Sequence, residues 1–396
     1  MNIIHDKFKV HSLTGRITPE LMIKAFKAVK KNRGAAGIDR ISIETFEKNL
    51  STYLPSLMID LKKGLYQPLP LRRVHIPKGI GKKETRPLGI PPIRCRVAQE
   101  VARQLINPTF EAVFHNNSYG FRPGRNCHQA IEGVLEYLQQ GYKFVVDADI
   151  KGFFDNIQHD LIMESVSAKI ADRNILKLIE KFLRSGVMEN GKLSPTTRGT
   201  CQGGVISPLL ANLVLNHFDW HMHKQGINFI RYADDFVLLC KTQQEAEKAL
   251  EIAKDFLEKE LLLILHPEKT KIVHLSEGFN FLGFFITDKG ITMRDKSKEK
   301  FTTKIKQLTI RSHNLDQEVI KKINQVVRGT VNYFYTSFST VKTQFTILDG
   351  FIRRRLRCMK YKRFSITDNH RLHNKHLKRM GLLNCMELGK ARFVSS

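Results

Sequence analysis

Short apolar runs alternate with long helical patterns through the middle of the chain. Runs rich in β-branched and aromatic residues at 143–149, 227–231, 236–240 and 271–275 are typical of strands. Between them, apolar residues recur at helical spacing over residues 159–170, 206–223 and 244–262. This alternation predicts an α+β fold, with an antiparallel sheet flanked by helices.

Other patterns flank this central region. Thr18 followed by Pro19 predicts a helix over residues 18–32, since Thr caps helices and Pro fits their first position. A second helix is predicted over 42–63, strands over 71–77 and 86–90, and a helix over 94–114. Beyond Thr292, helical spacing at 298–312, 316–335 and 340–361 continues without strand alternation. We therefore expect an all-helical C-terminal region.

The charge of the chain indicates a polyanionic partner. Its 396 residues carry a formal net charge of +27, and 42% of them are hydrophobic, as expected of a globular protein with two or three domains. Residues 297–396 hold 22 Lys and Arg against 6 Asp and Glu, a net charge of +16. We expect this part to grip a nucleic-acid duplex. No apolar run approaches the roughly 18 residues of a membrane span, so we expect no membrane partner.

The cysteines and histidines give weaker indications. The six cysteines show no Cys-x-x-Cys spacing, which is typical of reduced thiols in a cytoplasmic protein. His217 and His221 stand four apart on one predicted helical face, a spacing that zinc uses. No Glu stands between them in a catalytic arrangement, so a polar helix end is the preferred interpretation.

Two adjacent acids carry the strongest chemical signal. Asp234 and Asp235 lie between two predicted strands, so we expect them at a β-hairpin tip, where their charges repel each other. Mg²⁺ would offset this repulsion, since it binds carboxylates and completes its shell with water and phosphates. Two-metal phosphoryl transfer needs a further acid from another strand to hold ions roughly 3.5–4 Å apart. Asp147 and Asp149 both qualify because alternation places them on one strand face, and a solvated strand end is the alternative.

Nine motifs extend this signal along the chain, in the order Gly-Ala-Ala-Gly-Ile-Asp at 34–39, Ile-Pro-Lys at 76–78, Arg-Pro-Leu-Gly-Ile-Pro at 86–91, Tyr-Gly-Phe-Arg-Pro-Gly at 119–124, Asp-Ile-Lys-Gly-Phe-Phe-Asp-Asn-Ile at 149–157, Gln-Gly-Gly-Val-Ile-Ser-Pro-Leu-Leu-Ala-Asn at 202–212, Tyr-Ala-Asp-Asp at 232–235, Pro-Glu-Lys-Thr-Lys at 267–271 and Phe-Leu-Gly at 281–283. With these motifs, the chain resembles the reverse transcriptases of group II introns and their relatives from about residue 25 to about residue 380. The resemblance implies a right-hand polymerase with fingers, an α+β palm and a helical thumb.

The resemblance also implies a domain plan. Residues 1–65 form an N-terminal helical extension, and residues 66–142 with 186–205 form the fingers. The palm comprises 143–185 and 206–293. A helical thumb similar to maturase domain X covers 294–380, and 381–396 are a short C-terminal tail.

In the palm, the resemblance selects Asp149 as the first catalytic acid and gives Asp147 a supporting role. Asp149, Asp234, Asp235 and Ile150 are the implied ligands of two Mg²⁺ ions, with Mn²⁺ as a substitute. Lys269, preferred over Lys271, would protonate the leaving pyrophosphate as a general acid. A surface lysine is the alternative at both positions.

Four residues are expected to hold the incoming nucleotide. Lys78 and Arg86 would clamp its triphosphate, and Gln202 is a contact that the resemblance implies. Phe154 would lie under the sugar and collide with a 2′-hydroxyl, which favours deoxynucleotides. Its neighbour Phe153 is assigned to the core, on the view that the two are adjacent strand residues.

The helix after Gln202 is predicted to begin with Ser207 as N-cap and Pro208 at the first helical position. Cys201 departs from the family, which usually has Pro there.

In the C-terminal region, Arg353, Arg354 and Arg357 fall within one helical turn, so at least two are expected to face a phosphate backbone. Arg328 belongs to a segment that resembles the intron family's thumb, in which Thr330 replaces the usual Trp. Gly283 resembles the element that grips the primer end.

Together these expectations describe an RNA-directed DNA polymerase that copies RNA into cDNA, using dNTPs, an RNA template and a DNA primer. Its further partner would be a structured RNA, either an intron in a maturase and retrohoming role or a noncoding RNA in antiviral defence. The departures at Cys201 and Thr330 favour a relative recruited by its host. Two alternatives are an RNA polymerase of the same palm type and an RNA-binding maturase with little polymerase activity. A homo-oligomer is compatible with the sequence.

Overall fold

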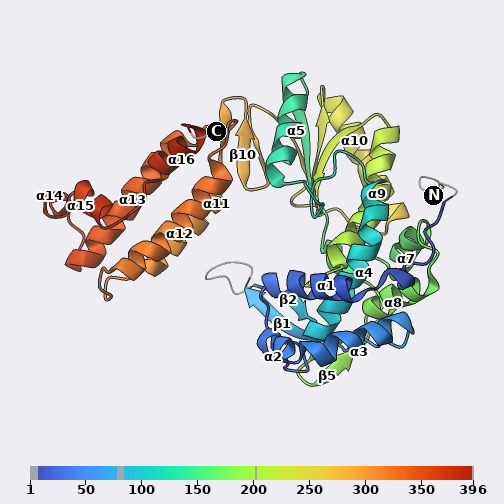
Figure 1. Cartoon of the computed structure of the whole chain (residues 1–396). Helices are drawn as coiled ribbons and strands as arrows, with labels where there is room; N and C mark the ends of the chain where they lie inside the picture. Colours follow the sequence, from blue (N-terminus) through green and yellow to red (C-terminus); the bar gives the residue numbers. More distant parts are fainter. Residues whose placement is uncertain (1–7, 78–83, 201–202, 395–396) are drawn as a thin grey trace. The chain divides into compact units, whose positions relative to one another are not determined.

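The computed structural model describes residues 8–77, 84–200 and 203–394 (Figure 1). The chain forms two compact units, Met1–Ile272 and Val273–Ser396, and each is described by itself. The division lies before the palm–thumb boundary expected at 293/294, so the last strands of the predicted palm cluster with the C-terminal helices. The domain plan itself stays a prediction.

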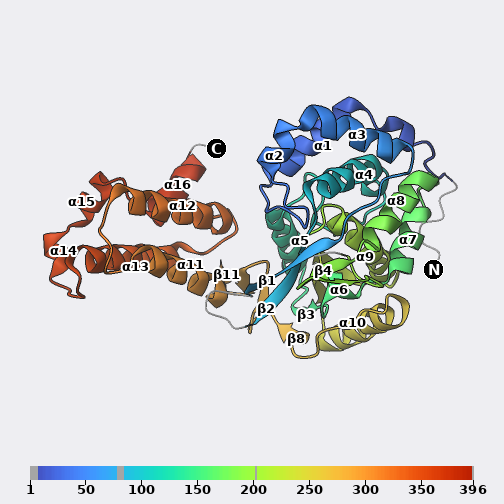
Figure 2. The ribbon, with the colours of Figure 1, turned by 90° about the horizontal axis from the view of Figure 1, so that it is seen from below.

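Helices and a small sheet make up the first half of the first unit. The helices α1, α3 and α4 contact one another, and Figure 2 shows α1 and α3 beside α4. The elements in this part are η1 (Thr14–Arg16), α1 (Pro19–Lys31), α2 (Ile43–Lys48), α3 (Leu50–Lys62), β1 (Leu71–Pro77), β2 (Thr85–Ile90), α4 (Ile93–Glu111) and α5 (Cys127–Gln139).

The second half of this unit contributes further helices and most of the second sheet. Its elements are β3 (Phe144–Asp149), α6 (Phe153–Asn156), α7 (His159–Ser167), α8 (Arg173–Leu183), β4 (Val187–Glu189), β5 (Lys192–Ser194), α9 (Ser207–Lys224), β6 (Asn228–Tyr232), β7 (Asp235–Cys240), α10 (Gln243–Asp255) and the π-helical turn η2 (Phe256–Glu260).

Two four-stranded sheets organise these elements. In one, β1 pairs antiparallel with β2 and parallel with β4, giving the order β2-β1-β4-β5. The other has the order β6-β7-β3-β8, where β8 (Lys271–His274) crosses the boundary between the units. Its central strands β3 and β7 run antiparallel, with buried valines and leucines facing the core. The α+β prediction is confirmed.

A mostly buried helix, α9, packs between α7, α4 and β6. Thirteen of its 18 residues are buried. Five of the buried residues are polar, and three of these, Asn212, Asn216 and Asp219, lie on one face because they are spaced by four and three positions. A polar face on a buried helix needs partners, because unpaired polar groups are costly in the interior.

The second unit begins with a small antiparallel sheet in the order β11-β10-β9, and beyond Met293 each element in the described part is a helix. The all-helical expectation is therefore confirmed there. The elements are β9 (Phe279–Phe281), β10 (Phe284–Thr287), β11 (Gly290–Met293), α11 (Asp295–Leu308), α12 (Gln317–Phe334), α13 (Lys342–Tyr361), α14 (Asp368–Arg371), α15 (Asn374–Arg379) and α16 (Cys385–Val394).

Three local predictions were wrong. The helix predicted over 42–63 breaks at Asn49, whose side-chain amide bonds to the Thr45 carbonyl at 2.9 Å and competes with the helical pattern. Helix α9 has Ile206 rather than Ser207 at its N-cap, because the Ile206 carbonyl already accepts from the Leu209 and Leu210 amides. Phe153 and Phe154 lie on the helical turn α6, which follows Gly152 in left-handed conformation, and not on a strand.

The segment predicted as a C-terminal tail contains a packed helix. Helix α16 contacts α12 and α13, and its first residue, Cys385, is buried. Asp349 on α13 caps this helix, since its carboxylate accepts from the Cys385 amide at 2.8 Å and from the Met386 amide at 3.3 Å.

Candidate active site

The two adjacent acids lie at a tight turn between β6 and β7. Tyr232 pairs with Asp235 across the hairpin, so Ala233 and Asp234 form a two-residue connection. Ala233 has φ of 59°, which is uncommon for a residue with a side chain. The surrounding structure must therefore hold this turn in place.

The third acid meets this turn from the neighbouring strand. Asp149, the last residue of β3, is directly opposite Asp235 in the antiparallel register. Opposed residues in such a pair have side chains on the same face, with Cβ atoms roughly 4.5–5.5 Å apart. The strand register and the turn thus bring Asp149 together with Asp234 and Asp235, the acids that the sequence selects.

The electrostatics of Asp234 report the same proximity. Burial raises the pKa of its carboxyl above the ordinary value, and the negative charge of Asp149 raises it further. The cations Arg231 and Lys269 act in the opposite direction. Two carboxylates that repel each other in a partly buried site have the arrangement that a divalent cation would stabilise.

Lys269 contacts the first acid. Its Nζ lies 2.5 Å from Asp149 Oδ2, forming an ion pair. The chain is held there because the Asp149 carbonyl accepts from the His266 amide at 2.7 Å and the Lys151 amide donates to Ile264 at 2.9 Å. The loop that carries Lys269 is therefore anchored beside the end of β3.

The described residues contain no group of three His, Cys, Asp or Glu side chains that forms a ready-made metal site. Mg²⁺ sites of phosphoryl-transfer enzymes commonly use one or two carboxylates and take their remaining ligands from water and substrate phosphates. The opposed Asp149 and Asp235, with the raised pKa of Asp234, fit a site of that open kind. Ile150 is buried beside them and offers only its main-chain carbonyl as a ligand.

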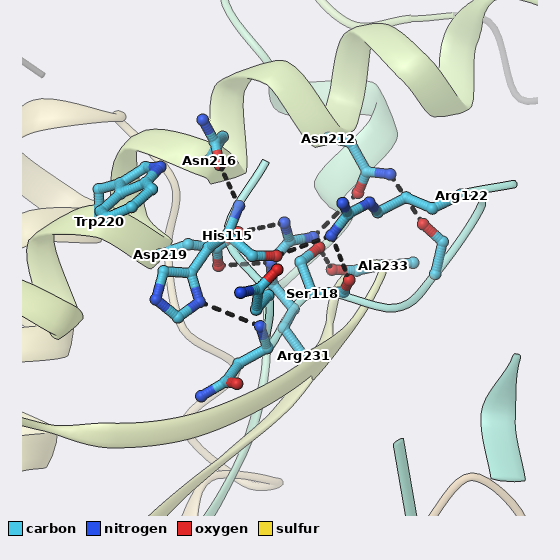
Figure 3. Close-up of polar contacts among 12 residues, drawn as sticks. His115, Ser118, Arg122, Asn212, Asn216, Asp219, Trp220, Arg231 and Ala233 are labelled. Atoms are coloured by element: carbon cyan, nitrogen blue, oxygen red, sulfur yellow. Dashed lines mark hydrogen bonds and ion pairs between the residues drawn. The ribbon is translucent and has the colours of Figure 1, made fainter. Parts of the chain in front are cut away.

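A fully buried ion pair lies behind the turn. Arg231, on β6, donates Nε to Asp219 Oδ1 at 2.7 Å and Nη2 to Asp219 Oδ2 at 2.5 Å (Figure 3). Its Nη1 donates to Asn212 Oδ1 at 2.9 Å and to the Ala233 carbonyl at 2.8 Å. The sequence-based selection of site residues missed Arg231, Asp219 and Asn212. The signal was the polar face of α9 together with one Arg in an apolar strand.

The segment before α5 closes the other side of the turn. A Cβ added to Gly120 would lie 2.3 Å from the Ala233 nitrogen, so only glycine allows this approach. Asn212 donates Nδ2 to the Gly120 carbonyl at 2.8 Å, and the Tyr119 amide donates to the Arg231 carbonyl at 2.9 Å. Gly120 of the 119–124 motif therefore packs directly against the turn that carries Asp234.

The predicted nucleotide-binding residues are only partly described. Phe154 is half-buried while Phe153 is buried, in keeping with the split assigned to them. Arg86 is exposed on β2, opposite Ile76. Lys78 and Gln202 lie outside the described residues.

The glycine loop after Gln202 lies against β2. A Cβ on Gly203 would be 2.4 Å from the Gly89 carbonyl oxygen, and the Val205 amide donates to Gln99 Oε1 at 2.7 Å. This close approach places the start of α9 against the sheet that carries Arg86.

In the second unit, Arg353, Arg354 and Arg357 line one cavity of about 620 Å³. Arg354 is exposed and Arg353 half-buried. The guanidinium of Arg357 instead donates to the Leu372 carbonyl at 2.9 Å and to Asn374 Oδ1 at 2.8 Å, so it ties α13 to the following segment.

The remaining predicted contacts of this unit lie elsewhere. Arg328 is exposed on α12. Gly283 has φ of 88° and follows Leu282, whose carbonyl accepts from the Tyr333 hydroxyl at 2.7 Å. The Gly283 carbonyl accepts from Ser297 Oγ at 3.1 Å, so α11 and α12 both fix this turn.

The histidines of α9 have separate partners. His217 lies 3.0 Å from Ser165 Oγ, His221 stacks on Phe256, and His223 lies 3.3 Å from His115. Within the described residues these side chains belong to no group of three or more potential metal ligands. None of the described helices is long and apolar enough to span a membrane.

Comparison with known proteins gives two family matches. Residues 76–286 match the family described as Reverse transcriptase (RNA-dependent DNA polymerase). Residues 298–381 match the family described as Group II intron, maturase-specific domain.

The chain is also similar to individual proteins. The chain is 36% identical over 305 residues to Protein YkfC of Escherichia coli (strain K12), covering 67% of this chain and 80% of that protein. It is 28% identical over 419 residues to Group II intron-encoded protein LtrA of Lactococcus lactis subsp. cremoris, covering 80% and 69% respectively. A solved structure titled Partial Cas6-RT-Cas1--Cas2 complex aligns with a TM-score of 0.37 and 26% identity over 62% of this chain and 42% of that chain.

Proposed function

Since the chain belongs to the reverse transcriptase family and is an RNA-directed DNA polymerase with a group II intron maturase-specific domain, we propose that Asp149, Asp234 and Asp235 form its catalytic centre and that a structured RNA is its partner. The observation that carries this proposal is the strand register of the sheet β6-β7-β3-β8. It sets Asp149 opposite Asp235, beside the turn that holds Asp234.

The acids would hold two Mg²⁺ ions, or Mn²⁺ in their place, together with the Ile150 carbonyl. Bound there, the ions supply Lewis-acid stabilisation of the attacking and leaving oxygens in nucleotide transfer. The protein's own part is to keep the carboxylates ionised and correctly placed. The charges of Arg231 and Lys269 serve this purpose by opposing the upward shift of the Asp234 pKa.

Lys269 is proposed as the proton donor to the leaving pyrophosphate. Its ion pair with Asp149 places the ammonium group at the acid that defines the reaction centre. A surface lysine held by chance would not need the main-chain anchoring of residues 264–266 to the end of β3. A general acid of this kind contributes typically 10²–10⁴-fold in rate.

The pocket for the incoming nucleotide would combine Phe154 with Arg86, Lys78 and Gln202. The half-buried ring of Phe154 follows Asp149 by five residues on the turn α6. A ring under the sugar would exclude a 2′-hydroxyl and select dNTPs. Arg86 would fork onto two oxygens of the triphosphate, with Lys78 as a point charge.

The second unit is proposed to bind the structured RNA through the cavity on α13. Phe364 and Ile366, which also line it, are 58% and 76% exposed. The loop that carries them is held by Asp368, a buried carboxylate paired with Arg363 at 3.0 Å. Apolar side chains presented beside Arg353 and Arg354 suit an unpaired base with its flanking phosphates.

The structured RNA would be a group II intron or a noncoding RNA of similar kind. The match of residues 298–381 to the maturase-specific domain favours the intron, and with it a second function as an aid to splicing. Cys201 and Thr330 depart from the intron enzymes and favour an RNA of a host defence system.

The proposed location of the protein is the cytoplasm. The five described cysteines are free thiols, which is typical of proteins in a reducing compartment.

Extension of a DNA primer on an RNA template with each nucleotide type tests the activity, and sequencing of the RNA that copurifies with the protein tests the partner. We expect extension with dNTPs, little with rNTPs, and a structured RNA in the preparation. Extension with rNTPs at an equal rate would contradict the role of Phe154. A preparation without any specific RNA would contradict the structured partner.

A further inference from the structure

We propose that Arg231 is a positioning residue of the polymerase. Through its buried ion pair with Asp219, Arg231 would hold the turn formed by Ala233 and Asp234, called the catalytic turn below, in its active conformation. The proposal rests on the function assigned above to Asp234. The Arg231 guanidinium contacts Asp219, Asn212 and the Ala233 carbonyl, and it would act on the turn through the main chain of Ala233.

The burial of this ion pair needs an explanation. Both side chains are 0% exposed. Removing two charges from water is expensive, and apolar residues of similar volume are often as stabilising in such a place. Stability alone therefore does not account for an Arg and an Asp behind the turn.

The geometry of the guanidinium shows what the pair can do beyond stability. Asp219 takes Nε and Nη2 in a two-point contact, which fixes the plane and the direction of the group. The remaining nitrogen, Nη1, then points at the Ala233 carbonyl at 2.8 Å. Lys offers a single point charge and would not make both contacts in a fixed geometry.

The contacted carbonyl belongs to the strained residue of the turn. Ala233 has φ of 59°, and the next residue is Asp234. A change in the Ala233 peptide would turn the Asp234 carboxylate away from Asp149. A misplacement of about 1 Å at a reaction centre can cost roughly 100-fold in rate.

Asn212 connects the pair to the other side of the turn. Its side chain accepts from Arg231 Nη1 (Figure 3) and donates to the Gly120 carbonyl, and a Cβ on Gly120 would meet the Ala233 nitrogen. Ala233 is therefore held on two sides, because Arg231 bonds to its carbonyl and the Gly120 segment packs against its nitrogen. Both contacts depend on the polar face of α9.

The test separates the effect on the turn from the effect on folding. Arg231→Met alone would leave Asp219 buried and unpaired, so it is compared with the double variant Arg231→Met with Asp219→Leu, which removes both charges. Arg231→Lys gives the conservative change. A matched control, Arg103→Met with Glu100→Leu, removes an ion pair of helix α4 whose Glu is also buried.

Four quantities are measured: the unfolding temperature, kcat for primer extension, the affinity for the template–primer duplex, and amide hydrogen exchange without metal or substrate. We expect the double variant to unfold within a few degrees of the wild type, to lose about 100-fold in kcat, and to keep its affinity for the template–primer duplex. Exchange should accelerate in the peptide that covers residues 228–236 and stay unchanged in β3. Arg231→Lys should keep the unfolding temperature and lose part of kcat, and the control pair should keep kcat.

A double variant with normal stability, normal kcat and normal exchange at residues 228–236 would overturn the proposal, since the pair would then serve the fold alone. Faster amide exchange in all strands of the sheet β6-β7-β3-β8, and not only at residues 228–236, would also overturn the proposal. The exchange readout does not depend on activity. A wild-type protein that extends no primer would thus refute the assigned function, while the exchange result still decides whether Arg231 holds the turn.

Discussion

The catalytic turn of the first unit and the α13 cavity of the second unit use charge in opposite ways. Behind the turn, Arg231 and Asp219 are fully buried and every guanidinium contact lies within the protein. Around the cavity, Arg354 is exposed and stands beside exposed Phe364 and Ile366. Charge that must place a side chain is buried and paired, whereas charge that must meet a polyanion is left at the surface.

The same contrast separates the arginines of α13 from one another. Arg357 is buried and bonded to Leu372 and Asn374, so it shapes the cavity. Arg353 and Arg354 are therefore the residues of this group that we propose as contacts for RNA. Sequence spacing treats the three alike, and only their packing distinguishes them.

The largest effect in this comparison is expected at the reaction centre. Lys269→Met should lower the rate of single-nucleotide addition about 100-fold, because the leaving pyrophosphate loses its proton donor. Lys271→Met is the matched control, and it should change the rate less than about threefold. If both changes lower the rate equally, Lys269 acts only through its positive charge and is not the proton donor.

Phe154→Val should weaken the choice between dNTPs and rNTPs by roughly tenfold to a hundredfold, since the ring that meets the 2′-hydroxyl is gone. The measurement is the ratio of kcat/KM for the two nucleotide types on one template. Phe153→Val is the control, because a change in the core should lower the unfolding temperature and leave the ratio intact. An unchanged ratio in Phe154→Val would remove this residue from the nucleotide site.

Phe364→Ala should weaken binding of a single-stranded RNA by about tenfold and leave binding of a blunt RNA duplex unchanged, since base stacking is worth roughly 1–3 kcal/mol per base. Arg354→Ala should instead weaken both and reduce the salt dependence of binding by about one phosphate contact. Titrations of labelled RNA at several salt concentrations check both expectations. A Phe364→Ala protein that loses duplex affinity equally would show that the cavity does not read unpaired bases.

The smallest effect concerns stability. The pKa of Asp234 is raised by burial and by Asp149, so the folded state binds a proton there more tightly than the unfolded state. The contribution of this proton binding to the free energy of unfolding is fully present below the ordinary Asp pKa. It is lost as pH rises through the raised pKa of Asp234 in the folded state. Asp234→Asn should therefore raise the unfolding temperature of the metal-free protein by roughly 2 °C at pH 7 and by nothing near pH 3. A lower unfolding temperature at pH 7 would contradict the repulsion between the two acids.

Local patterns in the sequence predicted the parts of the site that depend on one strand or one turn. Alternation placed the hairpin around Asp234, and the strand pairing then set Asp149 against Asp235. The support of the turn was not predicted, because Arg231, Asn212 and Gly120 meet only through the packing of α9 against β6. The signal available was a buried helix with polar residues at positions 212, 216 and 219.

Other departures have similarly local causes. Asn49 separates two helices, because its side-chain amide bonds back to the Thr45 carbonyl while its own carbonyl accepts from the Thr52 and Tyr53 amides, which apolar spacing alone does not reveal. Helix α16 has a local cap, since Asn384 Oδ1 accepts from the Glu387 amide at 2.9 Å, and the buried Asp349 of α13 adds a second one that its own sequence does not show. Helix α8 falls outside the predicted elements, although its buried residues, among them Ile175, Leu178 and Phe182, follow helical spacing.

The most direct measurement replaces Asp234 and Asp235 by Ala together and compares primer extension with RNA binding in the same preparation. The arrangement of the three acids predicts that extension with dNTPs falls below detection, while the affinity for the copurified RNA changes less than about twofold. Extension that persists at more than a few per cent of the wild-type rate would contradict the assignment of these acids to the reaction. Loss of RNA binding in parallel would show that they support the fold instead.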